Sequence, residues 1–154
     1  MMRYILIFFL LDGCQERWGC VVITNMDVTV YNRKYDETTH FDTWSRIVLH
    51  GVHVYVDHKT VVSDNGLNSA EVYKIRIPAD IPEADQYLPP EEYACCGGFG
   101  NWTIQNGDQI VLGECCQEIE KPADLKKLFQ RHCKVNSWSD NRFGSIPHWR
   151  VGGE

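Results

Sequence analysis

The stretch TWSRIVLHGVHVYVD, residues 43–57, carries the longest β signal in the chain and decides the fold class. It is rich in β-branched and aromatic side chains, which fit a pleated and partly buried surface. Gly51 lies in its middle. Because a glycine inside a strand pattern indicates a bulge or a sharp bend, we expect the strand to be bent there.

Shorter strand patterns lie on both sides of this stretch. The strongest short hairpin signal is Asn106-Gly107, so we expect the segments before and after it to pair with each other. Turns are also expected at residues 64–66 and 140–144, where Asp, Asn and Gly cluster. The further expected strands are residues 27–31, 70–77, 101–105, 109–115, 133–139 and 148–151.

One helix is expected, over residues 121–132, because Leu125, Leu128 and Phe129 follow helical spacing. Residues 78–93 combine four prolines with five acidic side chains and predict a long loop, with at most a short helical turn at residues 90–93. The expected fold is therefore mainly β with one helix. It is a small β-barrel or sandwich of about six to seven strands with a long acidic, proline-rich loop.

Composition and charge limit the classes of function. The chain has 154 residues and a formal net charge of −6, which does not favour sequence-independent binding to nucleic acid. Its hydrophobic fraction of 44% is that of a folded protein. The seven cysteines are odd in number and lack a regular spacing, so we interpret them as reduced thiols.

Residues 1–25 form an N-terminal extension with two interpretations. The apolar run 4–11 follows Arg3 and has the character of a signal-peptide core, and Cys14 follows it as the acceptor cysteine of a lipoprotein would. Alternatively, the extension lies upstream of a natural start at Met26. Residues 26–154 are expected to form a single β-rich domain.

Two sets of side chains are candidate metal ligands. His50, His53 and His58 share one strand, and alternation keeps them apart unless Gly51 bulges, so we interpret them as ordinary strand histidines. The doubled cysteines lie near the open end of the expected hairpin, and a zinc site is the alternative to structural thiols. They are Cys95, Cys96, Cys115 and Cys116.

We find no sequence pattern typical of catalysis. The glycine-rich stretch 97–100 lacks the Lys-Ser/Thr of a phosphate-binding loop, and there is no nucleophile elbow or metalloprotease helix. The sequence therefore predicts a protein that is not an enzyme and needs no cofactor. A zinc enzyme would require metal at the cysteine pairs and an open coordination position.

Three groups of segments, in a fixed order over residues 26–153, carry a resemblance to a family of small siphophage and prophage structural proteins. The ending is the most specific segment, and the doubled cysteines and the N-terminal extension depart from the family pattern. The segments are DVTVYN (27–32) with RIVLHGV (46–52), then GL (66–67), SAEV (69–72) and IRIP (75–78), and then WTIQNGDQIVLG (102–113) with DNRFGSIPHWRVGG (140–153).

Such proteins are encoded near the head–tail connector genes. The resemblance implies a virion structural protein of the neck, of the head-closure type, that assembles as a ring on the portal side. The partners implied are other copies of itself and portal, adaptor or tail proteins, with DNA passing through and no sequence-specific binding. The location implied is the virion, with the host cytoplasm during assembly and no membrane. The rival hypothesis is an exported, lipid-anchored binding module that uses Cys14.

A ring subunit meets its neighbours through loops, and the acidic loop is the expected contact segment. Tryptophans are the second kind of candidate, although in β proteins they more often belong to the core. The candidate interface residues are Asp80, Glu83, Asp85, Tyr87 and Trp149.

Overall fold

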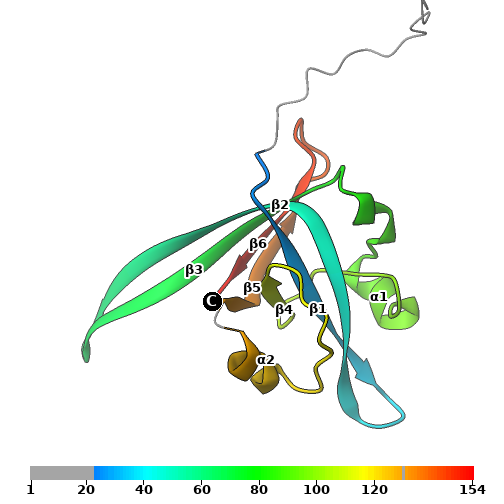
Figure 1. The fold of residues 1–154 in the computed structure, drawn as a ribbon, viewed down its shortest axis with the longest axis horizontal. Coiled ribbons are helices and arrows are strands. Elements are labelled where there is room, and N and C mark those ends of the chain that lie inside the picture. Colours follow the sequence, from blue (N-terminus) through cyan, green and yellow to red (C-terminus); the bar gives the residue numbers. More distant parts are fainter. Residues whose placement is uncertain (1–22, 130) are drawn as a thin grey trace, which may run out of the picture.

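The computed structural model describes residues 23–129 and 131–154 (Figure 1). Both the possible signal segment and Cys14 lie outside these residues. The described part is mainly β, with six antiparallel strands, one short 3-10 helix and two short α-helices. The elements are β1 (Met26–Asp36), β2 (Phe41–Ser63), β3 (Gly66–Pro78), η1 (Pro82–Gln86), α1 (Pro90–Cys96), β4 (Gln109–Leu112), α2 (Pro122–Leu128), β5 (His132–Asp140) and β6 (His148–Gly153).

The strands are hydrogen-bonded in the order β1-β2-β3-β6-β5-β4, and β4 pairs back with β1. The expected mainly β fold is therefore confirmed. Three of its local predictions are also confirmed: the strand around residues 43–57, the turn at residues 64–66 and the pairing of the last two strands across the 140–147 connection. Successive side chains of a strand point to opposite faces of the sheet, so each strand can bury one face in this arrangement.

Gly51 bends β2 and so allows this strand to pair with two neighbouring strands. It adopts a φ of +74°, and the register of β1 against β2 shifts between Met26 and Val28. Residues 41–52 of β2 pair with β1, whereas residues 53–63 pair with β3. A bulge bends a strand and increases its twist, so the glycine turns one long strand into a corner of the sheet.

The main core lies between the strands and includes the fully buried Val28, Leu49 and Ile75. An aromatic group closes it, with Trp102 and Trp149 stacked edge to face at 5.1 Å between ring centroids. A smaller apolar cluster lies on the other face of β1, where Tyr31, Val111, Cys115, Ile119 and Leu125 pack together. This second cluster holds α2 and the connection before it against the sheet.

The expected hairpin around Asn106-Gly107 is wrong. A turn does form, with the Asp108 amide donating to the Gln105 carbonyl at 3.3 Å, but the segments on either side do not pair. β4 pairs instead with β1 and β5. The reason is the buried Asp108 carboxylate, which accepts hydrogen bonds from the Arg33 amide at 2.9 Å and the Asn32 amide group at 2.8 Å. These contacts direct the chain after the turn along β1.

The helix expected over residues 121–132 does form, but it is shorter, and a second helix, α1, is also present. α2 ends at Leu128, because Phe129 takes an extended conformation that leads towards β5. In the segment 78–93, the helical turn expected at residues 90–93 is present as the start of α1, and the segment also contains η1. Trp102 fixes this segment: its indole N–H donates to the Glu83 carbonyl at 2.7 Å, and its backbone amide donates to the Gln86 carbonyl at 3.1 Å.

Candidate functional site

The cysteine pairs do not converge. Cys95 and Cys96 are exposed at the end of α1, and Cys116 is exposed after β4. Cys115 is buried in the smaller apolar cluster, where its Sγ lies 2.9 Å from the Tyr31 hydroxyl. The pairing that would have placed the cysteines together does not form, and none of the described cysteines joins a group of three potential metal ligands.

The expected interface residues fall into two groups. Asp80 and Asp85 are exposed, as a contact segment requires. Tyr87 and Trp149 are 8% and 1% exposed, so they belong to the core and are not surface anchors. Their rings lie 4.6 Å apart, and the Arg142 guanidinium covers them at 4.9 and 5.0 Å from the two centroids. Both residues lie near the acidic segment, but burying their large rings stabilises the core, so they pack inward.

Two hairpins extend beyond the core, one between β2 and β3 and one between β1 and β2 (Figure 1). We call residues 57–72 the long arm. Within the arm the strands pair only with each other, because β6 pairs with β3 from Tyr73 onward. At its tip Val61, Val62 and Leu67 are 52%, 79% and 73% exposed. A two-stranded hairpin with an apolar tip is marginally stable in water by itself.

A broad hollow of about 1170 Å³ lies between the β1–β2 hairpin and α2. Phe41, Trp44 and Ile119 supply its apolar lining, and Phe41 is 74% exposed. Lys121 and Lys126 add positive charge on the α2 side. The hollow is therefore suited to a ligand with an apolar surface, such as a protein segment.

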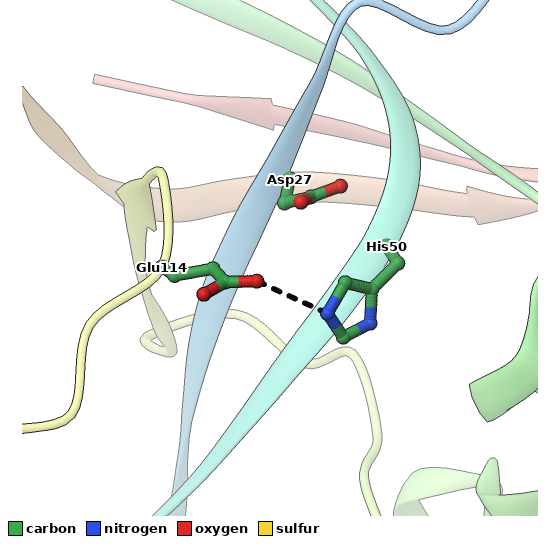
Figure 2. A group of neighbouring side chains, drawn as sticks. All are labelled: Asp27, His50 and Glu114. Carbon is green, nitrogen blue, oxygen red and sulfur yellow. Dashed lines mark hydrogen bonds and ion pairs between the residues drawn. The ribbon is translucent and has the colours of Figure 1, made fainter.

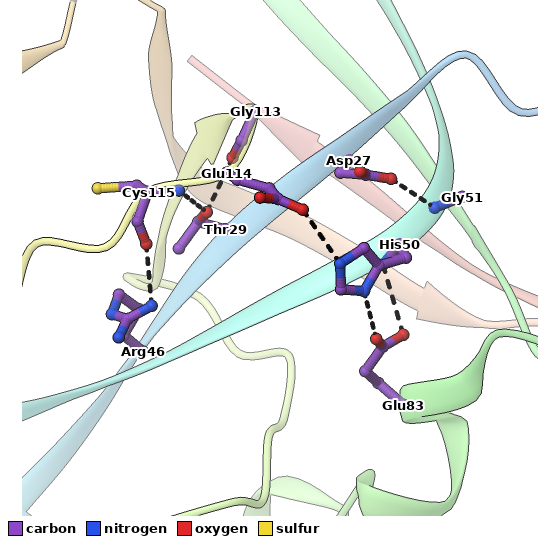
Figure 3. Close-up of polar contacts among 9 residues, drawn as sticks. All are labelled: Asp27, Thr29, Arg46, His50, Gly51, Glu83, Gly113, Glu114 and Cys115. Carbon is purple, nitrogen blue, oxygen red and sulfur yellow. Dashed lines mark hydrogen bonds and ion pairs between the residues drawn. The ribbon is translucent and has the colours of Figure 1, made fainter.

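A polar cluster gathers at the Gly51 bend, where His50 lies near Asp27 (Figure 2) and between two glutamates (Figure 3). The His50 Nδ1 atom lies 2.5 Å from the Glu83 carboxylate of η1, and its Nε2 atom lies 3.2 Å from the Glu114 carboxylate that follows β4. Asp27 at the start of β1 accepts a hydrogen bond from the Gly51 amide at 2.9 Å. One ligand atom each from Asp27, His50 and Glu114 lies within 4.8 Å of the others.

The charge at this cluster is strongly negative. Three carboxylates surround one imidazole, and no Lys or Arg side chain of the described residues forms an ion pair with any of the three. The hydrogen bond to Glu83 is the main reason why the pKa of His50 is raised, and Glu114 adds to it. The cluster can therefore hold a proton or a metal cation on His50.

Sequence reasoning missed this cluster because its members come from four distant positions: residues 27, 50, 83 and 114. The one local signal was Gly51, since the bulge there changes the direction in which His50 points. Glu83 was predicted as an interface residue, but its side chain is only 13% exposed and is bound to His50. Its position indicates a role within the chain.

The fold and these sites define a mainly β protein with two projecting hairpins and an acidic cluster centred on a histidine. The chain belongs to the family of unknown function DUF6751, which matches residues 23–154. Neither the curated proteins nor the solved structures include a significant match. Among the described residues, no helix has the length and apolar character that crossing a membrane requires.

Proposed function

We propose that this protein is a structural subunit that acts by binding other proteins, and specifically a head-closure component of the head–tail connector of a tailed phage. The observation that carries the proposal is the long arm, which ends in apolar side chains that are more than half exposed. A closed order of strand pairings, as in a small barrel, supports a rigid ring subunit. The resemblance of residues 26–153 to siphophage structural proteins supplies the connector role.

The long arm favours assembly on energetic grounds. Val61, Val62 and Leu67 are each more than half exposed, and burying what they expose is worth about 3–6 kcal/mol per arm. The arm also carries free strand edges, which natural proteins cover or pair. Insertion of this arm into a neighbouring subunit would bury its apolar tip and cover its free strand edges.

The occupant we propose for the hollow is the long arm of a second copy. The hollow offers Phe41 and Trp44, which match the apolar tip Val62 and Leu67 of the arm. Figure 1 shows the arm and the β1–β2 hairpin that borders the hollow projecting to opposite sides, so we propose that the two surfaces meet between copies and not within one chain. A contact between two different surfaces propagates head to tail, and it closes into a ring when the rotation per subunit divides a full turn.

Self-association of the full-length chain tests the arm. Val62→Ser together with Leu67→Ser removes the apolar tip, and Phe99→Ser changes a side chain that is exposed away from the arm and is the matched control. By light scattering over a concentration series we expect the double variant to raise the dissociation constant about 100-fold, as a loss of about 3 kcal/mol requires. A double variant that associates as well as the control contradicts the role of the arm.

The connector role has a separate test. After induction of a strain that carries the gene, gradient-purified particles are expected to contain peptides of this chain together with portal peptides. Recovery in the membrane fraction with residues 1–13 removed would instead favour the lipid-anchored alternative. Particles that lack the chain overturn the connector proposal, whatever the arm does.

A further inference from the structure

We propose that Asp27, His50 and Glu114 bind one divalent transition-metal cation, with Zn²⁺ the best match, and that Glu83 orients the imidazole. The donor set is one imidazole nitrogen and two carboxylate oxygens. Zinc accepts both kinds of ligand, and imidazole is a donor that magnesium and calcium seldom use. The proposal concerns metal binding and is independent of the assembly role.

The distances are close to those of a loaded site. With zinc–ligand bonds of about 2.0–2.2 Å, the donor atoms of a tetrahedral site lie about 3.4 Å apart. The His50 Nε2 atom and the Glu114 carboxylate are already 3.2 Å apart. The widest separation in the group is within 4.8 Å, so the Asp27 and Glu114 carboxylates would move closer together on metal binding.

Glu83 completes the arrangement on the other side of the ring. Metal-binding histidines commonly donate the N–H of the second ring nitrogen to a carboxylate, which fixes the tautomer and the ring orientation. Glu83 is 2.5 Å from the His50 Nδ1 atom, and a second contact of 3.4 Å joins its carboxylate to the His50 backbone amide. The Nδ1 proton is thereby directed to Glu83, and Nε2 faces Glu114 (Figure 3).

The charge balance calls for a cation. Asp27, Glu83 and Glu114 contribute three negative charges, and even a protonated His50 leaves a net charge of −2. Since no described Lys or Arg forms an ion pair with these carboxylates, the excess is not neutralised within the described chain. Zinc replaces the Nε2 proton, which is released to solvent, and the net charge becomes −1.

A bound cation adds a side-chain cross-link at the place where strand pairing brings β1, β2 and the end of β4 together. Asp27 is the second residue of β1, His50 lies at the Gly51 bend, and Glu114 lies on the connection between β4 and α2. Through Glu83 the acidic segment with η1 is also attached. We therefore infer a cation that rigidifies the bend, held by three protein ligands with water at the remaining position of a tetrahedral site.

Calorimetric titration of the full-length chain with Zn²⁺, after chelator treatment and under reducing conditions, tests the site. The variants Asp27→Asn and Glu114→Gln keep the side-chain shape and remove a charged ligand. We expect each variant to lower the affinity for one equivalent of zinc at least 10-fold. His58→Ala is the matched control, because His58 is an exposed histidine of the same strand that faces one carboxylate, Glu71, at 3.7 Å.

Two outcomes overturn the proposal. One is zinc binding that Asp27→Asn and Glu114→Gln leave unchanged, which assigns the metal to other groups such as the cysteines. The other is an imidazole of His50 that keeps both ring protons in excess Zn²⁺ at neutral pH, observed by nitrogen-15 NMR. That result would show that His50 serves only as a charged hydrogen-bond donor between the two glutamates. Circular dichroism of each variant checks that the fold is intact.

Discussion

Replacement of Gly51 by alanine measures the backbone cost of the bend on which both the sheet and the metal site depend. Gly51 has a φ of +74°, a conformation that L side chains rarely adopt. A Cβ atom at this position would meet only the Thr24 methyl group, at 3.9 Å. There is room for the added methyl group, so the whole cost is conformational, about 1–2 kcal/mol in the free energy of unfolding.

Urea unfolding followed by tryptophan fluorescence gives this free energy, with Gly51→Asn as the second variant. Asparagine tolerates the left-handed region better than alanine, so we expect it to lose less than about 1 kcal/mol. Gly144→Ala is the control, since a Cβ there makes an ordinary 3.7 Å contact at an unstrained φ and should change stability by less than about 0.5 kcal/mol. Equal stabilities for Gly51→Ala and the wild type, or for the alanine and asparagine variants, would refute the assigned role of the bend.

Two further predictions concern the core. Burial raises the pKa of Asp108 from 3.8 to about 6, so the folded state holds a proton more tightly than the unfolded chain, and its contribution to stability is lost as the pH rises from about 4 to 6. Urea unfolding should show that the free energy of unfolding of the wild type falls by about 2 kcal/mol across this pH range, whereas that of Asp108→Asn does not. If the free energies of the two proteins change in parallel with pH, Asp108 is not the group that titrates. Trp102→Phe should cost about 1–2 kcal/mol more than Trp149→Phe, because the Trp102 indole donates to the Glu83 carbonyl, whereas the Trp149 indole N–H has no partner among the described residues. Thermal unfolding of the two variants compares them, and equal losses would exclude a role for that hydrogen bond.

Much of the secondary structure could be predicted, because it depends on neighbouring residues. The alternation of apolar side chains located β2, β3, β5 and β6, and the bend at Gly51 followed from a glycine inside a strand pattern. Helix length was not predictable in the same way. Phe129 continues the apolar spacing of α2, but the start of β5 at His132 requires the chain to become extended before it.

The candidate sites were predicted less well, for a related reason. The cysteine pairs and the acidic segment are conspicuous in the sequence, yet the structure separates the former and packs part of the latter onto Trp102. The cluster around His50 has no sequence signature, because its carboxylates are spread from residue 27 to residue 114. Such a set becomes visible only when strand pairing brings β1, β2 and the end of β4 together.

The sequence by itself determined the β character of the chain, its bend at Gly51 and the turns that end several strands, since these depend on the conformational preferences of a few adjacent residues. The tertiary structure decided which strands pair, which aromatic side chains are buried and which polar groups meet at His50. Asp108 illustrates the difference: its buried carboxylate binds the backbone of β1 and so directs β4 to a distant partner in place of the nearby segment. Pairing between segments that are far apart in the chain follows the total burial and hydrogen bonding of the whole fold, and no short stretch of sequence contains that sum.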